Sequence, residues 1–98
     1  MSKVRQFVGI AWYRPGQWQR LREISSDAES LEDTYEEWLT IAEQNVRKAN
    51  RPNLSIEKVD VDVEELLAWC NERGLEVDGN SRSQYVSELM RQMHESEP

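Results

Sequence analysis

One amphipathic segment, residues 30–48, constrains the fold of this chain more than any other. Its apolar side chains recur at spacings of three and four residues, which places them on one face of a helix. The opposite face carries mainly glutamates, so this helix must pack against a core on one side and meet water on the other. Ser30 is expected to cap the helix, with Asp33 completing the cap three residues later. The apolar face consists of Leu31, Tyr35, Trp38, Leu39, Ala42 and Val46.

Two segments have the alternating apolar pattern of strands, residues 4–13 and residues 54–61. Apolar groups lie on both faces of the first segment, which predicts a strand covered on both sides, with Gly9 leaving room for a helix to approach. In the second segment the apolar phase changes near Glu57. This change predicts either a bulge at that point or a strand with one polar edge.

Three further helices are expected around these strands. The first begins at Pro15, because the fixed φ of proline suits the first turn of a helix. The next is capped by Asp62 and ends at Gly74, where glycine can adopt the left-handed conformation of a helix stop. The last is capped by Asn80 or Ser81.

These elements predict an α/β fold with the order β-α-α-β-α-α, in which four helices pack on a small, mainly parallel sheet. Strands that are joined by helices are more naturally parallel than antiparallel. Because a sheet of two strands is small, we expect a third short strand over residues 75–77 or strand pairing between subunits. Residues 1–98 should form a single domain whose last residues, 95–98, fray.

The composition indicates a cytoplasmic protein that does not bind membranes. A single cysteine cannot form an internal disulfide, which is typical of a reducing compartment. The apolar run over residues 7–13 is too short for a signal peptide or a membrane span. The net charge of −7 should repel nucleic acid and anionic lipid.

The charges are unevenly distributed along the chain. Residues 1–22 contain five basic side chains and no acid, whereas residues 23–46 contain eight acids and no base. The favoured interpretation is that the two segments lie side by side and neutralise each other. The alternative is a basic surface that contacts phosphates, which would make the chain a nucleic-acid-binding regulator. Its candidate contacts are Lys3, Arg5, Arg14, Arg20, Arg22 and Arg82.

No set of residues in the sequence specifies a reaction, so we expect no catalytic residue and no cofactor. Cys70 lies on an apolar stripe, and His94 lies in a final helical turn where a cation favours the helix dipole. The weak candidates for a metal site are Asp60, Asp62 and Glu64, whose carboxylates could hold a magnesium or calcium ion. A metal-dependent enzyme is therefore the least favoured hypothesis.

The favoured hypothesis is a non-catalytic protein-interaction module. The acidic face of the long helix can tune the choice of partner and the encounter rate. Trp69 lies at the flank of its helix, outside the stripe that points to the core, and tryptophan is enriched at interfaces. The predicted partner is an unidentified protein, with a second copy of the chain as one alternative. The predicted contacts are Glu32, Glu36, Glu37 and Trp69.

The second half of the chain has the parts of a ribbon-helix-helix domain. These are the strand Ile56–Val61, the helix ending at Arg73-Gly74-Leu75, and the helix start Ser81-Arg82-Ser83. This half resembles that family of DNA-binding domains. The resemblance implies that exposed strand side chains read bases and that the second helix begins at a phosphate.

Three other short segments of the sequence support a second resemblance, which covers most of the chain. They are Ile10–Arg14, Thr34–Leu39 and Leu67–Cys70. In these segments the chain is similar to a group of small bacterial proteins of unknown function. The resemblance implies a bacterial cytosolic protein and supplies no activity.

Overall fold

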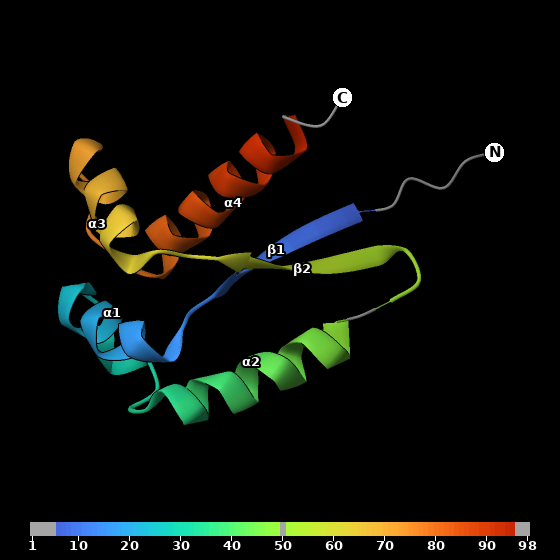
Figure 1. The fold of residues 1–98 in the computed structure, drawn as a ribbon, viewed down its shortest axis with the longest axis horizontal. Helices are drawn as coiled ribbons and strands as arrows, with labels where there is room; N and C mark the ends of the chain where they lie inside the picture. The colour runs from blue at the N-terminus through green and yellow to red at the C-terminus, as the bar shows by residue number, and fades with distance from the viewer. Residues whose placement is uncertain (1–5, 50, 96–98) are drawn as a thin grey trace.

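The computed structural model describes residues 6–49 and 51–95, which form a mixed α/β fold (Figure 1). Strands β1 (Gln6–Trp12) and β2 (Leu54–Asp60) pair in parallel and make a sheet of two strands. Their register continues without a break along both strands. The prediction of a bulge near Glu57 is therefore wrong. Strand β2 is instead regular, and the exposed side chains near its end are charged.

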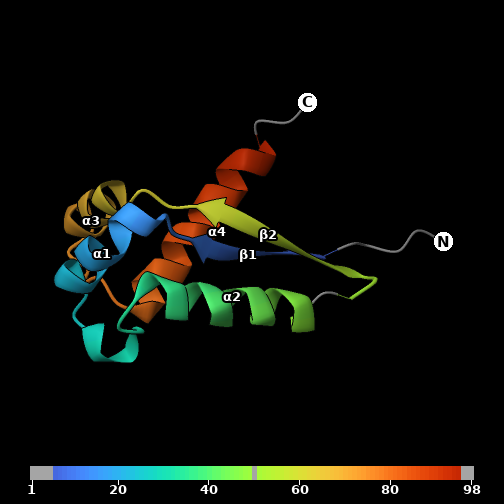
Figure 2. The same ribbon diagram turned by 60° about the horizontal axis from the view of Figure 1, so that its bottom comes forward.

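The helices confirm the predicted order β-α-α-β-α-α. Figures 1 and 2 show α2 along one face of the sheet and α4 across the other, while α1 and α3 lie together beyond the carboxyl ends of the strands. Among the described residues, no helix combines the length and the apolar character needed to cross a membrane. The helical elements are η1 (Pro15–Gln17), α1 (Trp18–Ile24), η2 (Ala28–Ser30), α2 (Tyr35–Ala49), α3 (Val63–Glu72) and α4 (Gly79–Glu95).

The start of the long helix α2 differs from the prediction. Ser30 belongs to η2 and does not cap α2, which begins at Tyr35. The cap is Thr34, whose Oγ1 accepts a hydrogen bond from the Glu37 N–H at 3.1 Å. In return, Glu37 Oε1 accepts from the Thr34 N–H at 3.2 Å. This reciprocal capping box satisfies two backbone donors at once, so it fixes the helix start four residues later than expected.

The start of α4 also differs from the prediction, by a similar mechanism. The Ser81 N–H donates to Asp78 Oδ1 at 2.9 Å, and the Asp78 N–H donates to Ser81 Oγ at 2.9 Å. Asp78 is therefore the cap, and neither Asn80 nor Ser81 takes that role. Ser81 is the reciprocal partner in the first turn, which explains why this serine is buried.

Both ends of α3 confirm the prediction. Asp62 accepts hydrogen bonds from the backbone N–H groups of Glu64 and Glu65. At the other end Gly74 has a φ of 67°, which a side chain would disfavour. The Leu75 N–H returns to the Cys70 carbonyl at 2.9 Å, which completes a Schellman stop.

The core lies at the carboxyl ends of the strands, and the opposite end of the sheet is open. The cluster there includes Leu21, Leu66 and Cys70, none of which is exposed to solvent. In contrast, Phe7 is 50% exposed and Val8 46% exposed. The prediction that the first strand is covered on both sides therefore holds only for its carboxyl half.

The prediction of a third strand over residues 75–77 is wrong, because the described part of the chain has no such strand there. Val77 forms only an isolated parallel bridge with Ser25, through a hydrogen bond from the Ser26 N–H at 2.8 Å. At the end of the chain, Glu95 closes α4 rather than beginning a frayed tail. The rest of that predicted tail, residues 96–98, lies outside the described residues.

Candidate functional site

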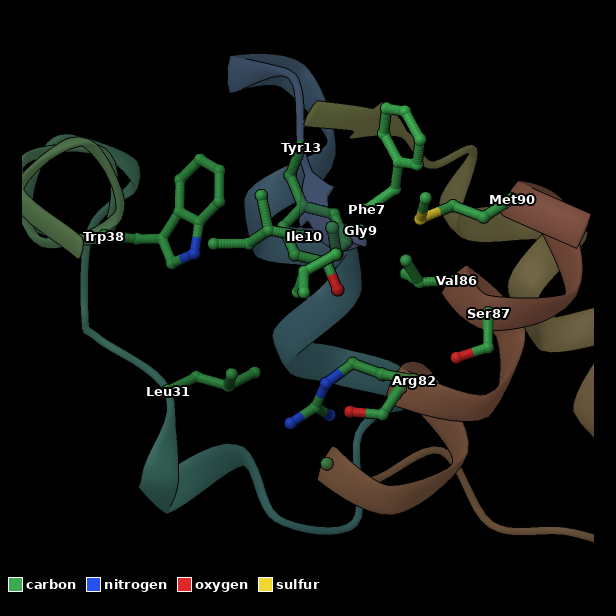
Figure 3. Close-up of a pocket in the computed structure, with 14 residues that line it drawn as sticks. Phe7, Gly9, Ile10, Tyr13, Leu31, Trp38, Arg82, Val86, Ser87 and Met90 are labelled. Carbon is green, nitrogen blue, oxygen red and sulfur yellow. The ribbon is translucent and has the colours of Figure 1, made fainter. Parts of the chain in front are cut away.

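An open cleft of about 690 Å³ runs along β1. Figure 3 shows Leu31 and Trp38 on one side, Val86 and Met90 from α4 on the other, and side chains of β1 between them. Most of the lining side chains are apolar, and the polar ones belong to Tyr13, Arg82, Ser83 and Ser87. The lining residues are Phe7, Val8, Gly9, Ile10, Ala11, Tyr13, Leu31, Trp38, Gly79, Arg82, Ser83, Val86, Ser87 and Met90.

The edge of β1 that faces the cleft has no neighbouring strand among the described residues. The Trp12 carbonyl accepts from the Val61 N–H at 3.2 Å, so Trp12 directs its backbone groups toward the β2 side. Backbone groups of successive strand residues point to opposite edges. It follows that the N–H and C=O groups of Phe7, Gly9 and Ala11 point away from β2, toward the free edge.

The two edges of the sheet differ in charge. The carboxyl half of β2 exposes Lys58 and Asp60, and charged side chains on an edge discourage pairing with another chain. By contrast, the β1 residues that line the cleft, over positions 7–11, carry no charge. The β1 edge is therefore the one that can accept a further strand.

Helix α4 approaches β1 very closely at Gly9, as the sequence predicts. A Cβ atom at this position would overlap Met90 Sδ and would lie 3.0 Å from Val86 Cγ1. Helix α4 thus forms one wall of the cleft and packs directly on the backbone of the strand.

The polar groups of the cleft gather at one end, around Arg82. The Arg82 guanidinium donates two hydrogen bonds of 2.9 Å to the carboxylate of Asp27 and one of 3.2 Å to Ser25 Oγ. Only 12% of the Arg82 side chain and 26% of the Asp27 side chain are exposed. The Arg82 hydrogen bonds hold the pKa of Asp27 below its usual value, although partial burial opposes the shift.

Tyr13 directs its ring into the same end of the cleft (Figure 3). It is only 5% exposed, and burial raises its pKa to about 12. The neighbouring charges of Arg82 and Asp27 have smaller, opposite effects on that pKa. The phenol therefore remains protonated at neutral pH and can donate a hydrogen bond.

The predicted partner contacts lie on different parts of the fold. Glu36 and Glu37 are exposed in the first turn of α2, whereas Glu32 uses its carbonyl to accept from Trp18 Nε1 at 3.0 Å. Trp69 lies on α3, where it is only half-buried as expected. Its ring packs against Tyr85 at a centroid distance of 5.3 Å, and it lines a separate cavity.

Each described residue of the predicted basic surface has an acidic partner. Only part of this neutralisation comes from residues 23–46, since Arg14 and Arg20 reach acids beyond the first half of the chain. Lys3 and Arg5 lie outside the described residues. The pairs are Arg14–Asp60 (3.3 Å), Arg20–Glu64 (2.7 Å), Arg20–Glu23 (3.6 Å), Arg22–Asp33 (3.5 Å) and Arg82–Asp27 (2.9 Å).

The candidate metal ligands are separately engaged. Asp60 pairs with Arg14, Glu64 pairs with Arg20, and Asp62 caps α3. Within residues 6–49 and 51–95, no three side chains of the types that ligate metals lie close enough to hold an ion. In this part of the chain the three carboxylates therefore have structural partners.

The remaining reactive side chains also have structural neighbours. Cys70 is fully buried in the core, as its position on an apolar stripe predicts. The His94 ring lies in the last turns of α4, 3.4 Å from a Glu57 carboxylate oxygen and against the ring of Phe7.

Sequence reasoning missed the cleft itself. Tyr13, Ser83 and Ser87 were not predicted as site residues, and Arg82 was predicted only as a contact to nucleic acid. The available signal was the uncharged stretch over residues 7–11 in an otherwise highly charged chain. Compared with protein-family models, curated proteins and solved structures, the chain has no significant match, so both resemblances stay predictions.

Proposed function

We propose that this chain is a non-catalytic protein-interaction module that binds an extended segment of another protein as a third strand on β1. The observation that supports it is an edge of β1 that pairs with no strand in the described part of the chain and that lies inside a mainly apolar cleft. In this mode of recognition, main-chain hydrogen bonds give affinity and the flanking side chains give specificity. The added strand would use the backbone groups of Phe7, Gly9 and Ala11.

Steric limits favour a foreign segment over a second folded copy. Paired strands lie about 5 Å apart, whereas packed helices need about 8 to 10 Å between their axes. Helix α4 packs directly over Gly9, at the middle of β1. A second β1 paired about this point would carry its own α4 into the same space. An extended segment without helices on its faces avoids this conflict.

The primary test changes the free edge of β1 without touching its bonds to β2. Phe7→Pro removes an N–H that points to the cleft, and proline is tolerated near the start of an edge strand. The probe is a pool of short synthetic peptides with one N-terminal lysine followed by valine, isoleucine, alanine and serine in random order. We expect Phe7→Pro to weaken binding of the pool about tenfold in a fluorescence titration.

The matched control is Lys58→Pro, which removes an N–H from the outer edge of β2, because that position alternates with the residues bonded to β1. This variant should bind the pool as the unchanged protein does. In the unchanged protein, the amide signals of Phe7, Gly9 and Ala11 should shift on titration. Equal weakening by both prolines, or no shift at these three amides, would contradict the proposed function.

A second prediction concerns the acidic face of α2. Glu36 and Glu43 are exposed, and unlike Glu37 they have no part in the helix cap. Reversing both charges, Glu36→Lys with Glu43→Lys, should slow association of the lysine-tagged peptides several-fold at low salt, because long-range attraction governs encounter. Stopped-flow rates measure this effect. The control is Glu72→Lys with Glu76→Lys, which makes an equal charge change at the end of α3 and in the connection after it. Equal slowing in both variants would show that the effect depends only on net charge.

A further inference from the structure

The polar end of the cleft contains several hydrogen-bond donors and leaves most of its lining apolar. Tyr13 contributes a phenol, Ser83 and Ser87 contribute hydroxyls, and Arg82 contributes a guanidinium. Figure 3 shows Tyr13, Arg82 and Ser87 around the same part of the cavity. A pocket of this kind, apolar with a few convergent donors, fits a ligand that has an acceptor group on an apolar body.

Arg82 has donor capacity that Asp27 does not use. A guanidinium has five N–H groups, and Asp27 with Ser25 accepts from three of them, all on Nη1 and Nη2. No residue of the described chain accepts from the remaining two, on Nε and Nη2. These two N–H groups lie on one side of the guanidinium and form the side-on fork that binds a carboxylate through both oxygens.

Tyr13 gives independent support for a ligand at this end. Its ring is buried and points into the cleft, while its hydroxyl is open to the cleft and has no hydrogen-bond partner within the described residues. A phenol hydroxyl that faces the cleft can donate to an acceptor bound there, such as a carboxylate.

We propose that this end of the cleft binds the C-terminal carboxylate of the segment that pairs with β1, an inference that rests on the proposed function. The carboxylate lies between Arg82 and Tyr13. Because Tyr13 directly follows the carboxyl end of β1, the bound segment runs parallel to β1. Its last side chains meet Leu31 and Trp38, so the partner ends in apolar residues.

The inference is tested with two versions of the peptide pool, one with a free C-terminal carboxylate and one with a C-terminal amide. The free acid should bind at least about tenfold more tightly, since a hydrogen bond to a charged group contributes about 1.5 to 3 kcal/mol. In the ¹⁵N-labelled protein, the free acid should also shift the Arg82 Nε–H signal, and the amide should shift it little.

Two matched phenol variants test the role of Tyr13. Tyr13→Phe keeps the ring in the core and removes the hydroxyl, so it should remove most of the preference for the free acid. Tyr85→Phe makes the same change in a tyrosine that is 6% exposed and lines a different cavity, and it should keep the preference. Retention of the full preference in Tyr13→Phe would overturn the assignment.

Other outcomes separate this inference from the function on which it rests. If both pools shift the amides of Phe7, Gly9 and Ala11 with equal affinity, the carboxylate site is wrong and strand addition stands. If neither pool shifts those amides, both proposals fail. Decanoate serves as a carboxylate on an alkyl chain without peptide groups. Tighter binding of decanoate than of the free-acid pool would assign the cleft to aliphatic acids and overturn both proposals.

Discussion

Gly9→Ala should lower the free energy of unfolding by about 2 kcal/mol, the cost of inserting a methyl group into a tightly packed contact. The new Cβ would overlap Met90 Sδ, and Val86 Cγ1 lies 3.0 Å away, so α4 must move or Met90 must change its rotamer. Alanine ordinarily favours a strand slightly over glycine, so the loss cannot come from propensity. Urea unfolding monitored by tryptophan fluorescence measures the effect.

The control is Gly16→Ala, because a Cβ at Gly16 meets no atom within 4 Å and its φ is not positive. This variant should be neutral or slightly stabilising. The partner of the clash is tested with Met90→Ala. In that background Gly9→Ala should cost much less, since the larger side chain has been removed. Additive losses in the double variant would show that the close approach of α4 is not the cause.

Local sequence signals predicted those parts of the fold that depend on neighbouring residues. Alternation of apolar residues gave both strands, and the stop at Gly74 with the cap at Asp62 gave both ends of α3. The parallel pairing followed from the helices between the strands, because such connections rarely leave strands antiparallel. These features can be predicted with little knowledge of the tertiary packing.

The helix starts could not be predicted because candidate caps overlap in the sequence. Ser30 precedes Asp33 by the same spacing that separates Thr34 from Glu37. The longer side chain of glutamate reaches back to the N–H of the capping residue, as the structure shows at Thr34. The sequence pattern alone does not show which of these two possible capping boxes forms, because the choice also depends on how the first helical turn packs.

The cleft depends on contacts between residues that are far apart in the chain. Leu31 lies in the connection between η2 and α2, Gly9 lies on β1 and Met90 lies on α4, so only tertiary packing brings them around one cavity. Arg82 was predicted as a nucleic-acid contact from the serine-basic-serine start of the last helix, a pattern that could not show that Arg82 would pair with Asp27. Charge blocks indicate that partners exist, and the fold decides which partner each arginine takes.

Arg82→Met should be the most destabilising exchange of a charged residue, with a loss of about 3 kcal/mol in the free energy of unfolding. The change leaves the Asp27 carboxylate, three-quarters buried, with the Gly79 N–H as its main partner. Arg14→Met is the matched control. Its partner Asp60 is 70% exposed, so this loss should be about 0.5 kcal/mol. Equal losses measured by urea unfolding would show that partial burial of the Arg82 pair has no effect.

The same pair gives stability a defined dependence on pH. Arg82 lowers the pKa of Asp27 in the folded chain, whereas in the unfolded chain that pKa is about 3.9. The stabilisation is therefore complete above about pH 5 and is lost as the pH falls through the two pKa values. The difference in free energy of unfolding between the unchanged protein and Asp27→Asn should be largest at neutral pH and should shrink below about pH 4. A difference that stays constant with pH would mean that Asp27 stabilises the fold through hydrogen bonds that asparagine also makes, and not through its charge.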